Sequence, residues 1–299
     1  MLSPIVLFVY NRPEHTRRTL NHLNMNELSD KSEIFIFSDG ARNIEDKEKV
    51  KEVRKIINNF VGFKNITIFQ SENNKGLAES VISGVTKIVN EYGKVIVLED
   101  DIVTSKYFLK FMNDALNFYK EKKKVWHISG WNYPIDPKRL GDAFLWRGME
   151  CWGWGTWDDR WNNFEKDTDK LIKEMTKEKI KKLNLDGTRN IWQQVIANKN
   201  EKLNTWAVYW YSKMIQNDAL SINPTVSYVK NIGLDGSGEN CGNNDFQKSK
   251  LSRKRDFDFP SFPLKENIIA VDRIKKFHRE KRGNLFVRGL KKIYRSIIK

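Results

Sequence analysis

The chain has 299 residues, 39% of them hydrophobic and 30% charged, a composition typical of a folded globular protein that excludes a disordered or fibrous one. The longest apolar run near the start, Ile5–Val9, is too short for a membrane span or a signal peptide, so we expect a cytoplasmic protein. Cys151 and Cys241 are expected to be reduced thiols, although one long-range disulfide remains an alternative. The net charge of +15 prompts a test for nucleic-acid binding, which depends on where the charge lies.

Most of the excess positive charge lies at the end of the chain. Residues 273–299 contain eleven Lys/Arg and one acid, a local charge of +10, so the other 272 residues carry only +5. Apolar residues recur there at helical spacing, which predicts a basic amphipathic helix suited to an anionic membrane surface: Phe286, Leu290, Ile293 and Ile297. The alternative is a helix packed on its own domain. We expect no nucleic-acid partner, because the body does not interleave basic and aromatic residues.

In chain order, the first 124 residues alternate short apolar runs with helical patterns. Strands are expected at Ile5–Tyr10, Glu33–Ser38, Ile66–Gln70 and Val95–Leu98, and helices from about Glu14 to Leu23, Asp46 to Phe60, Leu77 to Tyr92 and Lys106 to Lys122. This alternation indicates βαβ units, hence an α/β fold with a mostly parallel sheet and helices on both faces. Ligands of such sheets bind beyond the carboxyl ends of the strands.

The composition changes after Lys124. All ten tryptophans lie between Trp126 and Trp210, and a strand-like run, Thr225–Val229, precedes the turn-rich segment 231–238. Because no linker intervenes, we expect residues 1–124 and 125–265 to be two halves that share one sheet, followed by the basic tail, 266–299.

Three adjacent carboxylates, Glu99, Asp100 and Asp101, follow the fourth predicted strand without a spacer. Adjacent carboxylates repel one another, and their burial is costly unless a cation compensates. Mg²⁺ and Mn²⁺ prefer carboxylate oxygens and often bridge them to substrate phosphates. The alternative is a solvated acidic turn that caps the next helix. At the end of a strand in an α/β sheet, the triplet favours a metal site.

The other strand ends of the same edge carry further polar residues. Arg12 and Lys75 suit phosphate or a carboxylate, and Asp39 can accept hydrogen bonds from a ribose or a base. Asn74 lies beside Lys75, and ordinary turn chemistry is the alternative for all four. The sequence has neither a Walker-type phosphate loop nor a Gly-x-Gly-x-x-Gly fingerprint, which argues against an NTPase or a dinucleotide enzyme.

The order of these motifs resembles the GT-A glycosyltransferases, in particular N-acetylglucosaminyltransferase I and related bacterial sugar transferases. The matching segments, over about residues 4–240, are Asn-Arg-Pro, Ser-Asp-Gly, Asn-Lys-Gly-Leu-Ala, Val-Leu-Glu-Asp-Asp and Ser-Gly-Trp-Asn. The resemblance implies a hexosyl- or N-acetylhexosaminyltransferase that inverts the anomeric centre and uses a nucleotide-sugar such as a UDP-sugar. The acceptor would be a glycan, a lipid-linked sugar or a protein, as in polysaccharide biosynthesis.

By the same resemblance, Asp101 would ligate Mn²⁺ or Mg²⁺, and Glu99 and Asp100 would contact the donor. Arg12 and Asp39 fall where the family holds the nucleotide, and residues 1–124 would form the donor half. Two departures are visible: Trp206 is followed by Ala207 instead of an Asp, and the Gly-rich stretch ends in Gly238-Glu239-Asn240-Cys241, whereas that of bacterial relatives often ends with a His.

The second half, 125–265, would bind the acceptor and supply the catalytic base. Asp235, in the Gly-rich segment, is the first candidate for the base, and Asp159, Asp158 and Glu150 are the others. Indole rings stack on the C–H faces of sugars, so an acceptor groove could be lined by Trp131, Trp152, Trp154 and Trp206, with core packing as the alternative. A sugar nucleotidyltransferase and a non-catalytic carbohydrate-binding module are the competing functions.

Overall fold

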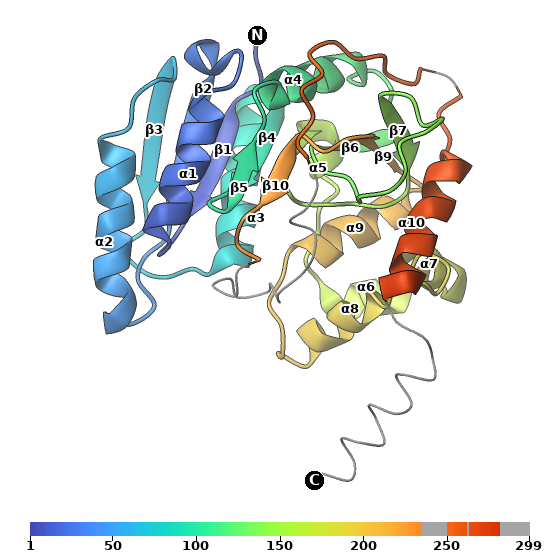
Figure 1. Cartoon of the computed structure of the whole chain (residues 1–299). Coiled ribbons are helices and arrows are strands. Elements are labelled where there is room, and N and C mark those ends of the chain that lie inside the picture. Colours follow the sequence, from blue (N-terminus) through green and yellow to red (C-terminus); the bar gives the residue numbers. More distant parts are fainter. Residues whose placement is uncertain (235–249, 262, 282–299) are drawn as a thin grey trace.

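The structure is a computed structural model that describes residues 1–234, 250–261 and 263–281. An eight-stranded sheet, in the order β3-β2-β1-β4-β8-β6-β9-β7, joins the two halves of the chain (Figure 1). Its strands are β1 (Ile5–Val9), β2 (Glu33–Ser38), β3 (Asn65–Gln70), β4 (Lys94–Glu99), β6 (Val125–Ser129), β7 (Ala143–Trp146), β8 (Trp154–Trp157) and β9 (Leu220–Pro224). The fold class expected from the sequence, a mostly parallel α/β sheet with helices on both faces, is confirmed.

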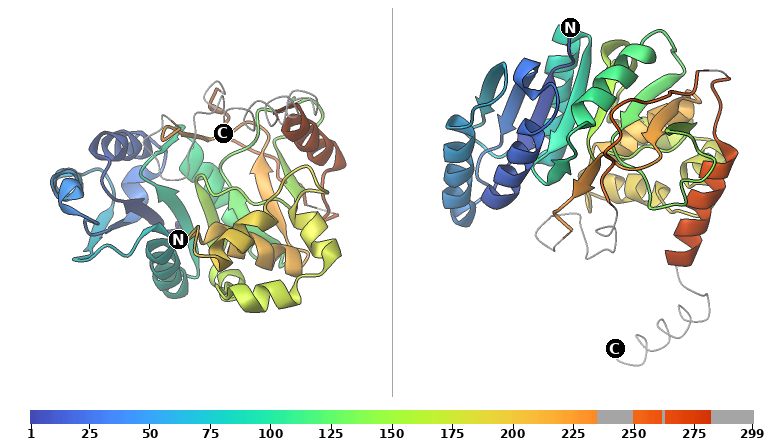
Figure 2. Two further views of the ribbon diagram at one scale, coloured as in Figure 1. Left: turned by 90° about the horizontal axis from the view of Figure 1, so that it is seen from below. Right: turned by 45° about the horizontal axis from the view of Figure 1, so that its top comes forward.

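Alternate residues of the central strands face opposite helical layers, as the two-residue period of a strand requires. Ile5 and Leu7 of β1 pack in one apolar cluster with residues of α1, α2 and α4, whereas Val6 and Phe8 pack in a second cluster with α3. Figure 2 shows α1 and α2 on one face of the sheet and α3 on the other. The helices of this half are α1 (Pro13–Asn24), α2 (Ile44–Asn58), α3 (Leu77–Tyr92) and α4 (Phe108–Phe118).

The direction of each strand decides which loops lie at which edge of the sheet. β1, β2, β3 and β4 are parallel, so their carboxyl ends share one edge. β8 runs antiparallel to β4, with Val97 opposite Trp154 and Lys94 opposite Trp157. β6 is antiparallel to β8 in turn, which returns Ser129 to the first edge. The segments before β8 and after β6 therefore lie near the acidic triplet, whereas the residues after Trp157 lie at the opposite edge.

A small two-stranded sheet covers the acidic strand end. β5 (Ile102–Thr104) follows Asp101 directly and pairs antiparallel with β10 (Val229–Asn231), with Asn231 opposite Ile102. The predicted strand Thr225–Val229 is wrong in its bounds, because the chain turns between Pro224 and Val229 to leave the large sheet for the small one.

The helices of the second half lie on both faces of the sheet, since those before residue 217 pack in the cluster that contains Trp154, whereas the last one packs in the opposite cluster. They are α5 (Asp158–Trp161), α6 (Thr168–Glu174), α7 (Lys177–Leu183), α8 (Trp192–Lys199), α9 (Ala207–Gln216) and α10 (Ile268–Lys281). α10 buries Ala270, Val271 and Ile274 in the protein core beside β7 (Figure 1). Among the described helices, none has the length and the hydropathy that crossing a membrane would require.

Candidate functional site

A cavity of about 380 Å³ lies at the carboxyl edge of the parallel strands. Its walls come from the ends of β1, β2 and β4, from the start of α2 and from the start of α3. The lining includes six of the seven residues predicted as donor or metal site, namely Arg12, Asp39, Asn74, Glu99, Asp100 and Asp101. The structure thus brings together side chains that are up to 89 positions apart in the sequence.

Arg12 and the two aspartates form the charged centre of this cavity. Arg12 lies at the N-cap of α1, and its Nη2 pairs with Asp100 Oδ1. Its Nη1 lies 3.1 Å from Asp101 Oδ2. Asp100 and Asp101 are buried, with only 3% and 4% of their surface exposed. A guanidinium donates in a fixed fork, so a single Arg12 bridges both carboxylates.

The free oxygen of Asp101 provides a test of whether a cation fits this strand end. Asp101 Oδ1 is buried and accepts no hydrogen bond from the residues that the structure describes. Such an atom is costly unless an ion or another partner satisfies it. Within the described ranges, no cluster of three or more His, Cys, Asp or Glu is arranged to hold a metal. Magnesium-type ions at phosphate sites need only one or two carboxylates plus substrate oxygens, so the residues fit such an ion.

The proton affinity of the triplet reflects an excess of negative charge. Burial, together with the charges of Asp101 and Asp100, raises the pKa of Glu99 to about 8. Burial also raises the pKa of Asp100 to about 6, even though the Arg12 guanidinium acts in the opposite direction. Burial alone would lower the pKa of Arg12, but the two aspartates raise it above its usual value. The site therefore favours an additional positive charge.

Asp39 has a different geometry from the one expected, because its carboxylate is already occupied. It accepts from the backbone N–H of Gly40 at 2.8 Å, of Lys75 at 2.9 Å and of Gly76 at 2.9 Å, and from Asn74 Nδ2 at 3.2 Å. These bonds fix the loop before α3, whose N-cap Gly76 has a φ of 79°. Asp39 lies in the cavity wall, but its contacts are those of a residue that positions the loop.

The side chains of the neighbouring residues Asn74 and Lys75 line different cavities. Asn74 Nδ2 also donates to Gly40 O at 2.8 Å, so its amide ties two loops of the cavity together. The exposed side chain of Lys75 lines a neighbouring cavity of about 330 Å³, which shares Phe37, Asp39 and Ser80 with the first.

Three residues of the cavity were missed by the sequence reasoning. Tyr10 follows β1, and its hydroxyl donates to Asp46 Oδ2 at 2.8 Å and accepts from Arg42 N at 2.9 Å. Asn11 Nδ2 donates to Asp46 Oδ1 at 2.6 Å. The sequence offers one signal for this group, an acidic residue, Asp46, in the first turn of the helix that follows the Asp-Gly turn. An acidic residue in a first turn predicts the start of a helix, but it does not identify Tyr10 as the partner of Asp46.

Glu150 lies before β8, near the cavity edge, and is already paired. Its Oε1 accepts from Tyr133 Oη and lies 3.2 Å from Arg189 Nη1. Burial raises the pKa of Glu150, while Arg189 and Tyr133 lower it. Burial raises the pKa of the next residue, Cys151, and the charges of Glu99 and Glu150 raise it further, which places this loop beside the acidic triplet. Cys151 is a free thiol, and Cys241 lies outside the described residues.

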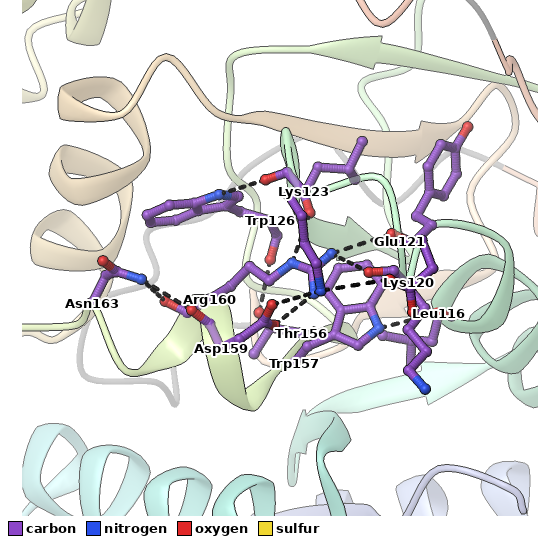
Figure 3. A network of polar contacts seen from close by, with 12 residues as sticks. Leu116, Lys120, Glu121, Lys123, Trp126, Thr156, Trp157, Asp159, Arg160 and Asn163 are labelled. Atoms are coloured by element: carbon purple, nitrogen blue, oxygen red, sulfur yellow. Dashed lines mark hydrogen bonds and ion pairs between the residues drawn. The ribbon is translucent and has the colours of Figure 1, made fainter.

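Asp159 does not belong to this site. It follows β8 at the opposite edge of the sheet, where Asp158 N donates to Gly93 O at 3.2 Å. Asp159 forms ion pairs with Lys123 at 2.9 Å and with Arg160 at 2.5 Å, and Figure 3 shows these three side chains together. Because β8 is antiparallel to β4, it carries Asp158 and Asp159, both predicted as possible bases, away from the cavity. The leading candidate, Asp235, lies outside the described residues.

The four tryptophans predicted for the acceptor groove divide into two pairs. Trp154 and Trp206 are 1% and 3% exposed and stack on each other with ring centroids 5.0 Å apart, which places both in the core, the alternative considered for them. Trp131 and Trp152 lie after β6 and before β8, at the same edge of the sheet as the cavity, with ring centroids 4.8 Å apart. Trp131 is buried and Trp152 only partly so, which leaves Trp152 as the more accessible ring.

Residues 5–122 match the model of the family described as glycosyl transferase family 2. The match covers β1 to α4, hence every wall of the cavity. This part of the chain is therefore similar to glycosyltransferases, as the sequence motifs predict. The narrower resemblance to N-acetylglucosaminyltransferase I stays a prediction. No curated protein matches the chain.

Several solved structures are similar in fold. They include TarS 1–349 of S. aureus (13% identity, TM-score 0.44, 77% of this chain and 60% of that one), GalNAc-T7 with UDP, GalNAc and Mn²⁺ (11%, 0.46, 75% and 43%) and a mannosyltransferase of Pyrobaculum calidifontis with GDP-Man and Mn²⁺ (10%, 0.42, 73% and 69%). The chain spans less than two thirds of the first two. At these identities the likeness concerns the fold alone.

Proposed function

We propose that this protein transfers a sugar from a nucleotide-sugar to an acceptor with the help of a Mn²⁺ or Mg²⁺ ion held by Asp101. The observation that carries the proposal is the buried Oδ1 of Asp101, which has no partner in the described part of the chain, in a residue that lines the same cavity as Arg12. The resemblance in sequence favours a UDP-sugar and an inverting reaction.

Different side chains of the cavity would bind different parts of the donor. Asp101, with Asp100 beside it, would hold the cation, which when bound neutralises the departing diphosphate. Arg12 is placed to bind the diphosphate because a guanidinium matches phosphate oxygens as well as carboxylates. Glu99 lines the cavity without a hydrogen bond to any described residue, so its carboxyl group is available to a sugar hydroxyl.

The nucleoside would lie against the ends of β1 and β2. Tyr10 lines the cavity, and its hydroxyl is held by Asp46, so the ring has a fixed position on which a base can stack. Asp39 acts indirectly by fixing the loop of residues 74–76 that closes this side. Lys75 would interact with the donor only from the neighbouring cavity.

The acceptor would approach from the side of Trp152, whose ring packs against that of Trp131. The reaction needs a carboxylate that takes the proton of the attacking hydroxyl. Glu150 is engaged with Arg189 and Tyr133, which leaves Asp235 as our first proposal for this base. A glycan, a lipid-linked sugar or a protein is the proposed acceptor.

We also propose that the basic tail contacts an anionic membrane, which would make the protein peripheral on a cytoplasmic face. Support comes from residues 282–299, which contain six Lys/Arg and no acid. The earlier part of the tail has a structural role, since Lys275 pairs with Asp186 at 2.5 Å and Ile274 is buried.

The donor can be identified by thermal unfolding with UDP, GDP, CDP or dTDP, each with Mn²⁺ or with EDTA. A ligand that binds only the native state raises the Tm, and at equal concentration a tighter ligand raises it more. We expect one diphosphate, UDP, to raise the Tm with Mn²⁺ and to lose most of this effect in EDTA. If no nucleotide shifts the Tm under either condition, the proposal fails.

A further inference from the structure

The acidic strand end contains a cation of the protein's own. Arg12 pairs with Asp100 and Asp101 at once, and no other Lys or Arg of the described residues pairs with the triplet. The side chain of Arg12 is 19% exposed and lines the cavity, so it has room to move toward the space that a donor would fill.

The pairing is incomplete on the aspartate side. One guanidinium faces three carboxylates, and Asp101 Oδ1 remains buried without a partner among the described residues. Arg12 thus occupies Oδ2 of the very carboxylate whose Oδ1 is free. A divalent ion that takes Asp101 must share this carboxylate with Arg12 or displace it, because two cations on one carboxylate repel each other.

We propose that Arg12 is a built-in counter-ion that competes with the divalent cation for Asp101 and is released by the donor diphosphate. This inference rests on the proposed function. When a diphosphate enters the cavity, Arg12 exchanges its contact with Asp101 for phosphate oxygens, which its planar fork matches equally well. Asp101 then becomes available to the cation that the same diphosphate binds.

The exchange makes metal and nucleotide binding mutually dependent. Without nucleotide, the Arg12–Asp101 contact opposes the cation, so the affinity for free Mn²⁺ is low. With nucleotide, the opposing contact is gone and the phosphates add ligands, so the affinity rises. By linkage, Mn²⁺ strengthens nucleotide binding by the same factor. The protein would thereby admit the cation together with the donor and not alone.

The test measures Mn²⁺ binding directly, from the electron paramagnetic resonance signal of the unbound ion, with and without UDP. For Arg12→Met we expect the affinity for Mn²⁺ without UDP to rise about tenfold or more, and the gain caused by UDP to shrink by a similar factor. The matched control is Arg17→Met on the same helix, whose partners Glu14 and Glu52 lie at 3.6 and 3.9 Å. It removes the same charge and should leave both affinities unchanged.

If Arg12→Met is unstable, a second variant, Arg12→Lys, and a second measurement, thermal unfolding, still decide the question. An ammonium lacks the planar fork, so Arg12→Lys should show a smaller rise of the same sign. In Arg12→Met, Mn²⁺ alone should raise the Tm more than in the wild type. Equal Mn²⁺ affinities without UDP in wild type and both variants, with normal binding in the presence of UDP, would overturn the competition only. Absence of Mn²⁺ binding even with UDP would overturn the proposed function as well.

Discussion

The backbone of Gly233 lies directly against the carboxylate of Asp101. A methyl group at position 233 would overlap Asp101 Oδ2 and would lie 2.8 Å from Arg12 Nη1. The neighbouring N–H of Ile232 donates to Asp101 O at 2.8 Å. A segment more than 130 residues downstream thus packs on the acidic strand end, and it can do so only because position 233 has no side chain.

Gly233→Ala should therefore impair the site without removing any charged group. The added methyl would push Asp101 away from its position or separate it from Arg12, at a cost typical of an overpacked contact. We expect the affinity for UDP with Mn²⁺ to fall roughly tenfold, about 1.4 kcal/mol. Isothermal titration measures this change.

Gly93→Ala is the control for a general effect of an added methyl. Gly93 ends α3 at a φ of 76°, and beyond its chain neighbours no atom lies within 4 Å of the place that a methyl group would take, so Ala there strains the backbone but enters no site. It should lower the free energy of unfolding by about 1 kcal/mol and leave the affinity unchanged. Equal losses of affinity in both variants would contradict the role assigned to Gly233.

The raised pKa values of the triplet predict a stability that depends on pH. The pKa of Glu99 is about 8 in the native state, above its ordinary value of 4.5, so the native state binds more protons than the unfolded state between these values. Its contribution to stability is fully present below pH 4.5 and is lost as the pH rises through 8. In EDTA, the free energy of unfolding from urea titrations should fall between pH 5 and 8.

Glu99→Gln separates this effect from the other titrating groups, because the amide keeps the shape and lacks the charge. The pH slope should be smaller in this variant, with the remainder between pH 3.8 and 6 arising from Asp100, whose pKa is also raised. An identical slope in wild type and Glu99→Gln would show that Glu99 is not the group responsible.

Asp159→Asn should be almost silent in catalysis. Asp159 lies at the far edge of the sheet, its side chain is 43% exposed, and Arg160 keeps its hydrogen bonds to backbone oxygens (Figure 3). We expect a transfer rate within about twofold of the wild type and a stability change below about 1 kcal/mol. By contrast, Glu150→Gln removes the counter-ion of the partly buried Arg189 and should lower the free energy of unfolding by about 2 kcal/mol. A large loss of rate in Asp159→Asn would return Asp159 to the candidate bases.

The proposed membrane contact is best tested by removing residues 282–299 and keeping all of α10. A longer deletion would also remove buried Ile274 and the Lys275–Asp186 ion pair, and would confuse unfolding with lost binding. Each of the six removed basic residues can contribute about 1 kcal/mol near an anionic surface. Cosedimentation with phosphatidylserine vesicles should fall sharply and show a weak salt dependence. Unchanged cosedimentation would exclude this part of the tail as the contact.

The donor side could be predicted from the sequence because local patterns determine it. Each of the first four strands is a short apolar run followed by a helix, and in parallel units this places Arg12, Asp39 and Asp101 at one edge. The hydrogen bonds of Asp39 could not be predicted, since its backbone partners lie 36 and 37 residues away. The same applies to the Tyr10–Asp46 pair.

The second half was harder to predict, because neither the direction of a strand nor the burial of a side chain leaves a local signal in the sequence. The run Trp154–Trp157 is compatible with either strand direction, and only its antiparallel pairing with β4 carries Asp159 to the far edge. Likewise, the sequence shows that tryptophans are abundant but not which face they occupy. Trp206 stacks on Trp154 across 52 positions, a contact made by the packing of α9 against the sheet.

The most direct test of the account is the dependence of donor hydrolysis and transfer on Mn²⁺ in Asp101→Asn. This substitution leaves the Arg12–Asp100 pair in place and removes the charge that would hold the cation. We predict that the Mn²⁺-dependent rate falls roughly 100-fold or more while the Tm in EDTA is not lowered. A variant that retains the full rate in EDTA would contradict a cation-assisted transfer at this strand end.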